Sequence, residues 1–397
     1  MITHRLGRLG AWIAALFALL TFAMPHLAAQ SVRGVTDTEI LIGTVTDLSG
    51  VGAIQGVNNS QAIRMAFDEV NAKGGIHGRK IRYIVEDHQY QVPRAVQGMN
   101  KLLSRDGVFI TIGNGGTPMN NANMATLIEH NVPNVFPLTA ARSMYEPFNR
   151  MKFAQFASYY DQMRAGLKYF VEQKGKKTVC AMYQDTDFGR DVYSGVVDQV
   201  KAMNMTIVAE TSHKPTDTDF SASLARLRDA KCDLIAVGTI VRDTDMILST
   251  AKKMGWEVTF LGQFASYDTG VAEAPGGIGE GFYSMSPSLI AYPDDPRAPV
   301  QDFSRAYKSR FGINPNFMGE MGYAAAQVVI LALDRAGRDL TLEKFLTAME
   351  GIQGYQDIFG SPPISLSPTD HHGSTLAWLA VVKNSRWVPA VDHPLGY

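Results

Sequence analysis

Short apolar runs rich in β-branched residues alternate along this chain with longer segments of helical periodicity. The first run covers 40–45, and in the next segment Ile63, Phe67 and Val70 recur at helical spacing before Gly74 and Gly75 end the helix. The same alternation then predicts strands at 81–86, 108–113 and 134–137, and helices at 93–104 and 119–130. Four successive strand–helix units predict a doubly wound parallel sheet.

The alternation restarts after residue 155 and predicts a second α/β lobe of similar design. Its helices are expected at 162–173, 190–203, 220–230 and 243–254, and its strands at 178–183, 206–210, 234–238 and 259–262. The stretch 300–350 is helix-rich, has no predicted strand, and is expected to return to the first lobe.

The predicted fold class is therefore α/β, with two doubly wound parallel-sheet lobes joined by a three-segment hinge. The crossings are expected near 152–156, 283–287 and 359–362. The predicted division of the chain is 30–153 with 286–359 for lobe 1, and 154–285 with 360–397 for lobe 2. In an open α/β sheet, a ligand binds beyond the carboxyl ends of the strands, so two facing lobes predict a ligand cleft between them.

Residues 1–29 have the layout of a secretory signal peptide. Arg5 and Arg8 give a positive start, an apolar run extends from Leu9 to Met24, and small residues follow up to Ala29. The apolar run is nearer 15 residues than the roughly 20 that span a bilayer, which argues against a membrane anchor. We expect cleavage after Ala29 and a periplasmic location.

Charge and cysteine content exclude several classes of function. The 397-residue chain has 37 Lys plus Arg against 38 Asp plus Glu, so a formal net charge of −1 gives no reason to expect nucleic acid. Two cysteines, Cys180 and Cys232, cannot build a Cys-rich zinc site. Disulfides form in the periplasm. Adjacent parallel strands rarely have disulfide geometry, so two buried thiols are expected, with a bond as the alternative.

The sequence also lacks common enzymatic motifs. G-x-S-x-G, the P-loop motif and a G-x-G-x-x-G after the first strand are absent, and so is H-E-x-x-H. His371 and His372 form the one close histidine pair, but adjacent side chains point apart, so a shared metal is not expected. We therefore expect neither catalysis nor a cofactor nor a metal.

A series of motifs resembles one known family. The segment 40–50 (ILIGTVTDLSG) is followed by NAKGGIHG at 71–78, PRAV at 93–96 and GNGGTP at 113–118, and later by YQDTDFG at 183–189 and SPTD at 367–370. Over nearly the whole mature chain, this order and spacing resembles the type I periplasmic substrate-binding proteins of ABC importers, the class that includes the leucine/isoleucine/valine-binding protein.

In the first lobe, the residues point to a site for an anion. The loop at 113–117 ends a predicted strand and opens a helix, so its glycines allow close backbone approach and its free N–H groups favour a negative charge. By resemblance, Thr117, after Gly116, occupies the position of a Ser or Thr that holds the ligand carboxylate. Leu138 and Ala140 fall at further ligand positions. Ala140 lacks a hydroxyl, which Thr139 would supply if the register slips by one.

In the second lobe, the resemblance separates ligand classes. Amino-acid binders place an acid just after the strand that corresponds to 259–262, and here Phe264 stands at that position. Burying an ammonium without a counter-charge costs several kcal/mol, which argues against an α-amino acid. A shift of one or two residues would instead bring Asp268 into the site. Further contacts are expected from Phe188, from Tyr160 or its neighbour Tyr159, and from Gln55, which would bind a ring substituent.

The resemblance thus implies a monomeric periplasmic receptor. It would capture a small carboxylate with an aromatic or apolar body and no amine, and deliver it to an ABC permease and its ATPase subunits. The alternative ligands are a branched-chain amino acid and an amide or urea. Presentation of the ligand to a signalling partner remains an alternative role.

Overall fold

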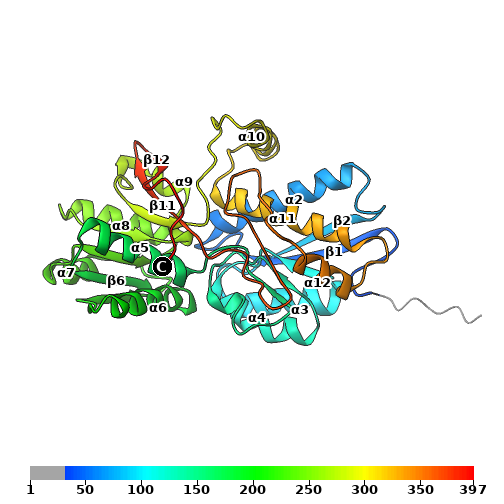
Figure 1. The fold of residues 1–397 in the computed structure, drawn as a ribbon, viewed down its shortest axis with the longest axis horizontal. Helices are drawn as coiled ribbons and strands as arrows, with labels where there is room; N and C mark the ends of the chain where they lie inside the picture. The colour runs from blue at the N-terminus through cyan, green and yellow to red at the C-terminus, as the bar shows by residue number, and fades with distance from the viewer. Residues whose placement is uncertain (1–31) are drawn as a thin grey trace, which may run out of the picture. The chain divides into compact units, whose positions relative to one another are not determined.

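Two sheets organise the part of the chain that the structure describes. The computed structural model describes residues 32–397, so the predicted signal peptide at 1–29 lies outside the described residues. One sheet has the strand order β2-β1-β3-β4-β5, and the other has the order β12-β11-β10-β9-β8-β6-β7 (Figure 1). The predicted α/β class with two parallel-sheet lobes is confirmed, and from here lobe 1 denotes the first sheet with its helices and lobe 2 the second.

The sheet of lobe 1 is parallel throughout, and its switch point lies between β1 and β3. Apolar side chains of β1 and β3 are buried on both faces, as a parallel sheet requires. The strands are β1 (Glu39–Thr46), β2 (Lys80–Asp87), β3 (Ile110–Ile112), β4 (Asn134–Val135) and β5 (Lys152–Phe153). The connecting helices are α2 (Ala53–Ala72), α3 (Val92–Asn100) with its continuation η1 (Lys101–Asp106), and α4 (Thr117–Glu129), and the turn η2 is Arg142–Met144.

Lobe 2 repeats this design and extends it with antiparallel strands. The parallel strands are β6 (Val179–Gln184), β7 (Glu210–His213), β8 (Leu234–Gly238), β9 (Thr259–Gly262) and β10 (Tyr283–Ser286), followed by antiparallel β11 (Trp378–Lys383) and β12 (Arg386–Pro389). The helices are α5 (Tyr159–Lys174), α6 (Asp187–Ala202), α7 (Ser221–Asp229), α8 (Val241–Lys253) and α9 (Thr269–Ala272), and the 3-10 turns are η3 (Phe264–Ser266) and η4 (Pro275–Gly277).

The sequence prediction missed the antiparallel hairpin. Asn384 and Ser385 both have positive φ angles, of 52° and 58°, which is the two-residue turn that suits the twist of paired strands. The turn lies between β11 and β12, where an apolar run is followed by Arg386-Trp387. The predicted strand at 206–210 was also displaced, because β7 begins at Glu210.

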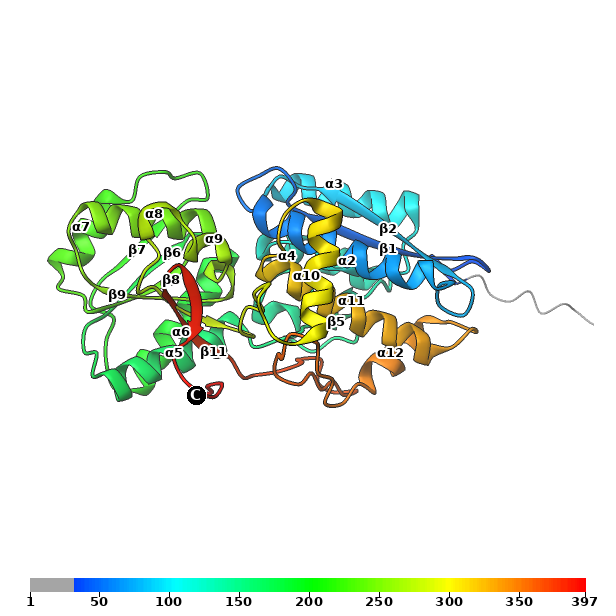
Figure 2. The ribbon, with the colours of Figure 1, turned by 90° about the horizontal axis from the view of Figure 1, so that it is seen from above.

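The helix-rich stretch returns to lobe 1, as predicted. It contains α10 (Ala298–Phe311), α11 (Phe317–Ala336) and α12 (Leu342–Glu350). Figures 1 and 2 show α11 alongside α2, and a side chain at Gly322 would lie 2.5 Å from the carbonyl oxygen of Asn59. Within residues 32–397, α11 is the one helix long and apolar enough to cross a membrane, and 72% of its apolar window is buried, which marks it as a core helix.

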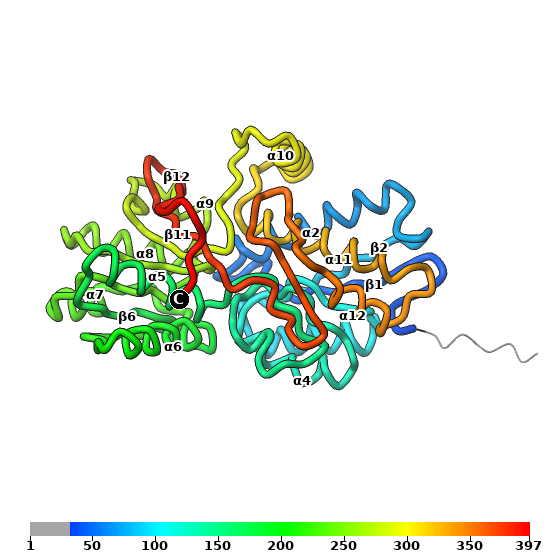
Figure 3. Tube along the Cα trace, in the orientation of Figure 1, coloured from blue at the N-terminus to red at the C-terminus, as the bar shows by residue number. Residues whose placement is uncertain are grey.

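The first crossing segment pairs with the stretch of chain that precedes β11. Ala154, in the first crossing, donates its N–H to the carbonyl of His371 and accepts a hydrogen bond from the N–H of Gly373. The chain then continues to β11, a path that Figure 3 traces from α12. The expected lobe boundaries, including a third crossing near 359–362, remain a prediction.

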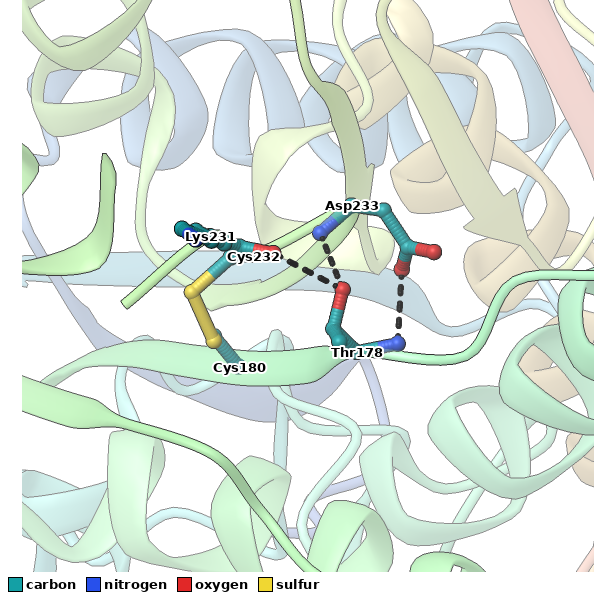
Figure 4. The surroundings of a disulfide bond; sticks show 5 residues. All are labelled: Thr178, Cys180, Lys231, Cys232 and Asp233. Atoms are coloured by element: carbon teal, nitrogen blue, oxygen red, sulfur yellow. Dashed lines mark hydrogen bonds between the residues drawn. A yellow bond between two sulfur atoms is a disulfide. The ribbon is translucent and has the colours of Figure 1, made fainter. Parts of the chain in front are cut away.

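Cys180 and Cys232 form a disulfide, contrary to the expected pair of thiols. Their Cα atoms are 5.9 Å apart. The bond forms because Cys232 lies in the turn before β8 rather than in a strand. Figure 4 shows Thr178 holding this turn: its hydroxyl donates to the Lys231 carbonyl and accepts from the Asp233 N–H, and its own N–H donates to the Asp233 carboxylate.

Candidate functional site

A cavity lies where the carboxyl ends of the central strands of both lobes meet. Lobe 1 contributes side chains and backbone from the segments that follow its first four strands, and lobe 2 contributes an apolar wall. The lobe 1 lining is Thr46, Asp47, Gly52, Gln55, Gly56, His88, Tyr90, Gly115, Gly116, Thr117 and Leu138, and the lobe 2 lining is Tyr159, Phe188, Ile240, Phe264 and Ala265. The cavity thus occupies the position expected from the two switch points.

Hydrogen-bond donors converge at the start of α4. Gly116 has a φ of 80° and precedes the first helical residue, Thr117, so the first-turn N–H groups have no intrahelical acceptor. The hydroxyls of Thr117 and Thr139 are hydrogen-bonded at 2.7 Å. Thr46 adds a buried hydroxyl that has no hydrogen-bond partner among the described residues. A side chain at Gly115 would come within 2.5 Å of that hydroxyl, so only glycine leaves room beside it.

A neutral histidine braces the same loop. The Nδ1 of His88 accepts the N–H of Tyr90 at 3.0 Å, which leaves the proton on Nε2, and Nε2 donates to the Gly115 carbonyl at 3.1 Å. Burial lowers the pKa of His88, which keeps the ring uncharged. No Lys or Arg lines the cavity in the described part of the chain, so the hydrogen-bond donors at this end are uncharged.

Asp47 is a carboxylate on the wall that sequence reasoning did not select. Its Oδ1 accepts the N–H groups of Ser49 and Gly50 at 3.2 and 2.6 Å, and its Oδ2 accepts that of Gly52 at 2.8 Å. Gly52 caps α2, so the positive end of the helix dipole faces this carboxylate. The D-L-S-G segment directly after β1 was the available signal.

The lobe 2 wall consists mainly of aromatic rings. The rings of Tyr159 and Phe188 meet edge to face, with centroids 5.0 Å apart, and Phe264 lies 6.4 Å from Tyr159. Phe264 is 1% exposed, and its N–H donates to the side chain of Gln162 at 2.8 Å, which fixes the loop after β9. Burial raises the pKa of Tyr159 to about 12, so its hydroxyl stays protonated.

Six of the nine sequence-predicted residues line the cavity, and Thr139 and Ala140 lie directly behind it. Thr139 bonds Thr117, and the Ala140 carbonyl accepts the N–H of Tyr159 at 2.8 Å. The six lining residues are Gln55, Gly116, Thr117, Leu138, Phe188 and Phe264.

Tyr160 does not line the cavity, and Tyr159 does. The Tyr160 hydroxyl donates to Asp198 at 2.8 Å, and the Arg142 guanidinium lies 4.0 Å from the centre of its ring. Successive residues of a helix point about 100° apart, so one of the two tyrosines at the start of α5 faces the cavity and the other does not.

Hydrogen bonds give two other expected residues, Gln55 and Asp268, specific partners. The Gln55 amide donates across the cleft to the Ala265 carbonyl at 3.0 Å, so this group connects the lobes. Asp268 is absent from the lining and instead caps α9 by accepting the Gly270 N–H at 2.9 Å. Phe264, and not Asp268, therefore lines the cavity.

The lobes are in contact across the mouth of the cavity. Besides Gln55, the Tyr90 hydroxyl donates to the Gln184 side chain at 3.2 Å, and Asn121 donates to Asp187 at 2.8 Å. Lobe 1 residues thus meet β6 and the start of α6.

Residues 32–397 hold no group of three or more His, Cys, Asp or Glu side chains placed to bind a metal ion. The predicted histidine pair has a structural place: His371 Nδ1 bonds the Lys152 carbonyl at 2.7 Å, and His372 Nε2 bonds that of Phe156 at 3.1 Å. Both imidazoles thus hold the first crossing segment.

Comparison with known proteins places this architecture in a family. Residues 39–386 match the family model described as periplasmic binding protein. The leucine-, isoleucine-, valine-, threonine- and alanine-binding protein of Pseudomonas aeruginosa is 22% identical over 335 residues, covering 84% of this chain and 85% of that protein.

Solved structures share the fold. A branched-chain amino acid ABC transporter protein from Thermus thermophilus with bound valine has a TM-score of 0.83 at 18% identity, covering 91% of this chain and 98% of that one. A solute-binding protein from R. palustris in complex with benzoate has a TM-score of 0.79 at 19% identity. The match covers 90% of this chain and 96% of that one. The match over residues 39–386 shows that this chain belongs to the periplasmic binding protein family.

Proposed function

We propose that this chain captures a small carboxylate that has an aromatic or compact apolar body and no ammonium group. The observation that carries the proposal is the division of the cavity between the lobes. An unpartnered buried hydroxyl, that of Thr46, and the start of α4 stand on one side, and the rings of Tyr159, Phe188 and Phe264 stand on the other.

The polar side supports an anion bound by neutral donors. A buried hydroxyl without a partner costs about 1–3 kcal/mol, so a ligand oxygen that accepts from Thr46 regains that free energy. Hydrogen bonds to a charged oxygen are about twice as strong as neutral ones, and the N-terminus of α4 adds a favourable dipole. Thr117 is placed to contribute its hydroxyl or its N–H.

The apolar side supports a ligand without an amine. Phe264 stands at the wall where an acid would be needed, and the carboxylate of Asp268 is used by α9. The free space in the cavity is small, about 30 Å³. This favours a compact ligand over a long chain.

Asp47 favours a second candidate, an amino acid whose ammonium would reach this carboxylate. Three backbone N–H groups already bond Asp47, and they must remain because they shape the loop before α2. The valine-bound and benzoate-bound neighbours show that the fold serves both ligand classes, so the choice rests on the wall residues.

In the proposed mechanism, the ligand first binds one lobe, and contacts with the other lobe favour closure. Such a ligand shifts an existing equilibrium between open and closed forms, because it contacts both lobes only in the closed form. The loaded receptor, a periplasmic monomer exported through residues 1–29, then delivers its ligand to an ABC permease.

Calorimetric titration of protein refolded after denaturation, which removes carried-over ligand, tests the proposal. The panel is benzoate, hexanoate, benzamide and valine. We expect benzoate to bind with a dissociation constant at least 100-fold below that of benzamide, since the amide lacks the charge. At 100 times its dissociation constant, benzoate would add about 2.7 kcal/mol of stability. Tight binding of valine, with none of benzoate, would reject the proposal in favour of the Asp47 candidate.

A further inference from the structure

The loop after β2 contains two consecutive non-glycine residues in the left-handed region. Gln89 has a φ of 52° and Tyr90 a φ of 55°. A bulky residue rarely adopts this conformation, and it persists only where the surroundings enforce it. Such positions cluster at ligand-binding sites, and Tyr90 lines the cavity.

The surroundings enforce this turn through the neighbouring loop that follows β1. A side chain at Gly50 would lie 2.6 Å from the backbone of Gln89, and one at Gly52 would lie 3.3 Å from the ring of Tyr90. The Asp87 carboxylate joins the two loops, because it accepts the Gln89 N–H at 3.0 Å and the Ser49 hydroxyl at 2.6 Å. The backbone of Tyr90 is therefore fixed before any ligand arrives.

From this fixed backbone, the Tyr90 side chain reaches lobe 2. Its hydroxyl donates to the Gln184 Oε1 at 3.2 Å, at the end of β6. Gln184 is fully buried, and its amide N–H donates to Asp243 at 3.2 Å, so its carbonyl oxygen is held toward lobe 1. Tyr90 is thus both a wall of the cavity and a hydrogen bond between the lobes.

We propose that Tyr90 limits the length of the ligand, an inference that rests on the proposed function. A short acid leaves room for the ring and lets the hydroxyl bond Gln184 when the lobes close. A longer acid holds the ring away from Gln184, so the Tyr90 hydroxyl loses that acceptor, whereas the Gln184 oxygen keeps its hydrogen bond from the Thr186 hydroxyl at 3.1 Å. A site rejects a ligand strongly when its own buried polar groups lose their partners.

The test compares two aromatic acids, benzoate and 3-phenylpropanoate, by calorimetric titration of refolded protein. The wild type should bind benzoate at least ten-fold more tightly. Tyr90→Phe keeps the ring and loses the hydroxyl. We expect it to weaken benzoate about five-fold and to leave 3-phenylpropanoate within two-fold, because the longer acid never had the bond to lose. Tyr90→Ala removes the ring as well. It should reduce the ratio of the two dissociation constants, which is the preference for benzoate over 3-phenylpropanoate, at least ten-fold.

Tyr193→Phe is the matched control, because the Tyr193 hydroxyl pairs with Glu210 and its ring stacks on Tyr183 outside the cavity. This variant should bind both acids as the wild type does. If Tyr90→Phe weakens both acids equally, or neither, the length-limiting role is wrong. Circular dichroism shows whether Tyr90→Ala folds. If it does not fold, the affinities of Tyr90→Phe for the two acids still test the length-limiting role. A wild type that binds neither acid would instead refute the proposed function.

Discussion

The two walls of the cavity offer a ligand different kinds of contact. The lobe 1 wall is made of loops whose backbone groups and hydroxyls have fixed directions, set by the hydrogen bonds of Asp47, His88 and Thr117. The lobe 2 wall is made of ring surfaces, among them Phe188 and Phe264, that impose shape but few directions. Hydrogen bonds are directional, whereas apolar burial is not.

This difference separates two tasks of a hinged receptor. Lobe 1 would recognise the charged group, which many ligands share, and lobe 2 would test the remainder of the ligand during closure. In the proposed mechanism, the free energy gained from the apolar wall would exist only in the closed form, so this wall would drive the population shift. Changes in the lobe 2 wall should therefore alter ligand class, and changes in the lobe 1 wall should alter affinity for any carboxylate.

The largest expected effect comes from giving the lobe 2 wall a charge. Phe264→Asp places a second carboxylate in the buried cavity, which should weaken benzoate about a thousand-fold, or about 4 kcal/mol, through repulsion and desolvation. Phe264→Leu, the control, should remain within about ten-fold of the wild type. Calorimetric titration measures both. Equal affinities in the two variants would mean that residue 264 does not face the ligand.

The next largest effect is on stability, and it comes from the end of lobe 2 that lies away from the cavity. Cys180 lies near the start of β6, and the cavity lies beyond its end, at Gln184. Replacing both cysteines by Ala should lower the free energy of unfolding by about 4 kcal/mol, because the bond closes a loop with a sequence separation of 52. The benzoate dissociation constant should change less than two-fold. Equal melting temperatures with and without a reductant would contradict this expectation.

The strand and helix pattern was readable from sequence because a parallel sheet needs continuous apolar runs, as in β8, which was predicted at its observed bounds. The hairpin of β11 and β12 was missed because its turn is built from Asn384 and Ser385 without glycine. The disulfide was underestimated because its geometry depends on a turn outside the strands.

The cavity was predicted less completely. Phe188, Phe264 and Thr117 were selected through the family resemblance, and each follows the carboxyl end of a strand, which is where an α/β sheet opens its cleft. Asp47, His88 and Tyr90 were missed because they act through loop conformation. Nothing in the composition of 86–90 indicates that two residues adopt positive φ angles. The sequence left Tyr160 and Tyr159 as alternatives, because the helix start, which sets the direction of each side chain, was predicted three residues too late.

A smaller effect compares two buried threonines that both lack a hydrogen-bond partner. Thr46 lines the cavity, and Thr211 lies on β7, away from it. Thr46→Val should weaken benzoate about thirty-fold, or about 2 kcal/mol, because it removes a donor to a charged oxygen. Thr211→Val should leave the affinity within two-fold and the stability equal or higher. If both variants bind like the wild type, Thr46 does not contact the ligand.

The smallest expected effect concerns charge in lobe 2 away from the aromatic wall. Asp245, on α8, has an unpartnered buried oxygen. Burial, with a smaller effect from Asp268, raises the pKa of Asp245 to about 7, and burial raises that of Asp268 to about 6. The folded pKa of Asp245 lies above the unfolded value of about 4, so its contribution to stability is present below pH 4 and is lost as the pH rises through 7. Burial lowers the pKa of His88 and His371, whose contributions are lost as the pH falls.

Comparing Asp245→Asn with the wild type measures the contribution of the Asp245 carboxylate alone. The histidines contribute equally to the free energy of unfolding of both proteins, so their contribution cancels in the difference. The variant should be more stable than the wild type by about 1 kcal/mol at pH 8, a figure reduced from the full shift because part of the side chain is exposed. The difference should shrink as the pH falls toward 4, where the wild-type carboxyl is protonated in both states. Denaturant unfolding at pH 8, 6 and 4.5 measures it, with Asp229→Asn, an exposed site on α7, as control. If the variant gains the same stability at every pH, then Asn improves packing and ionisation of Asp245 does not destabilise lobe 2.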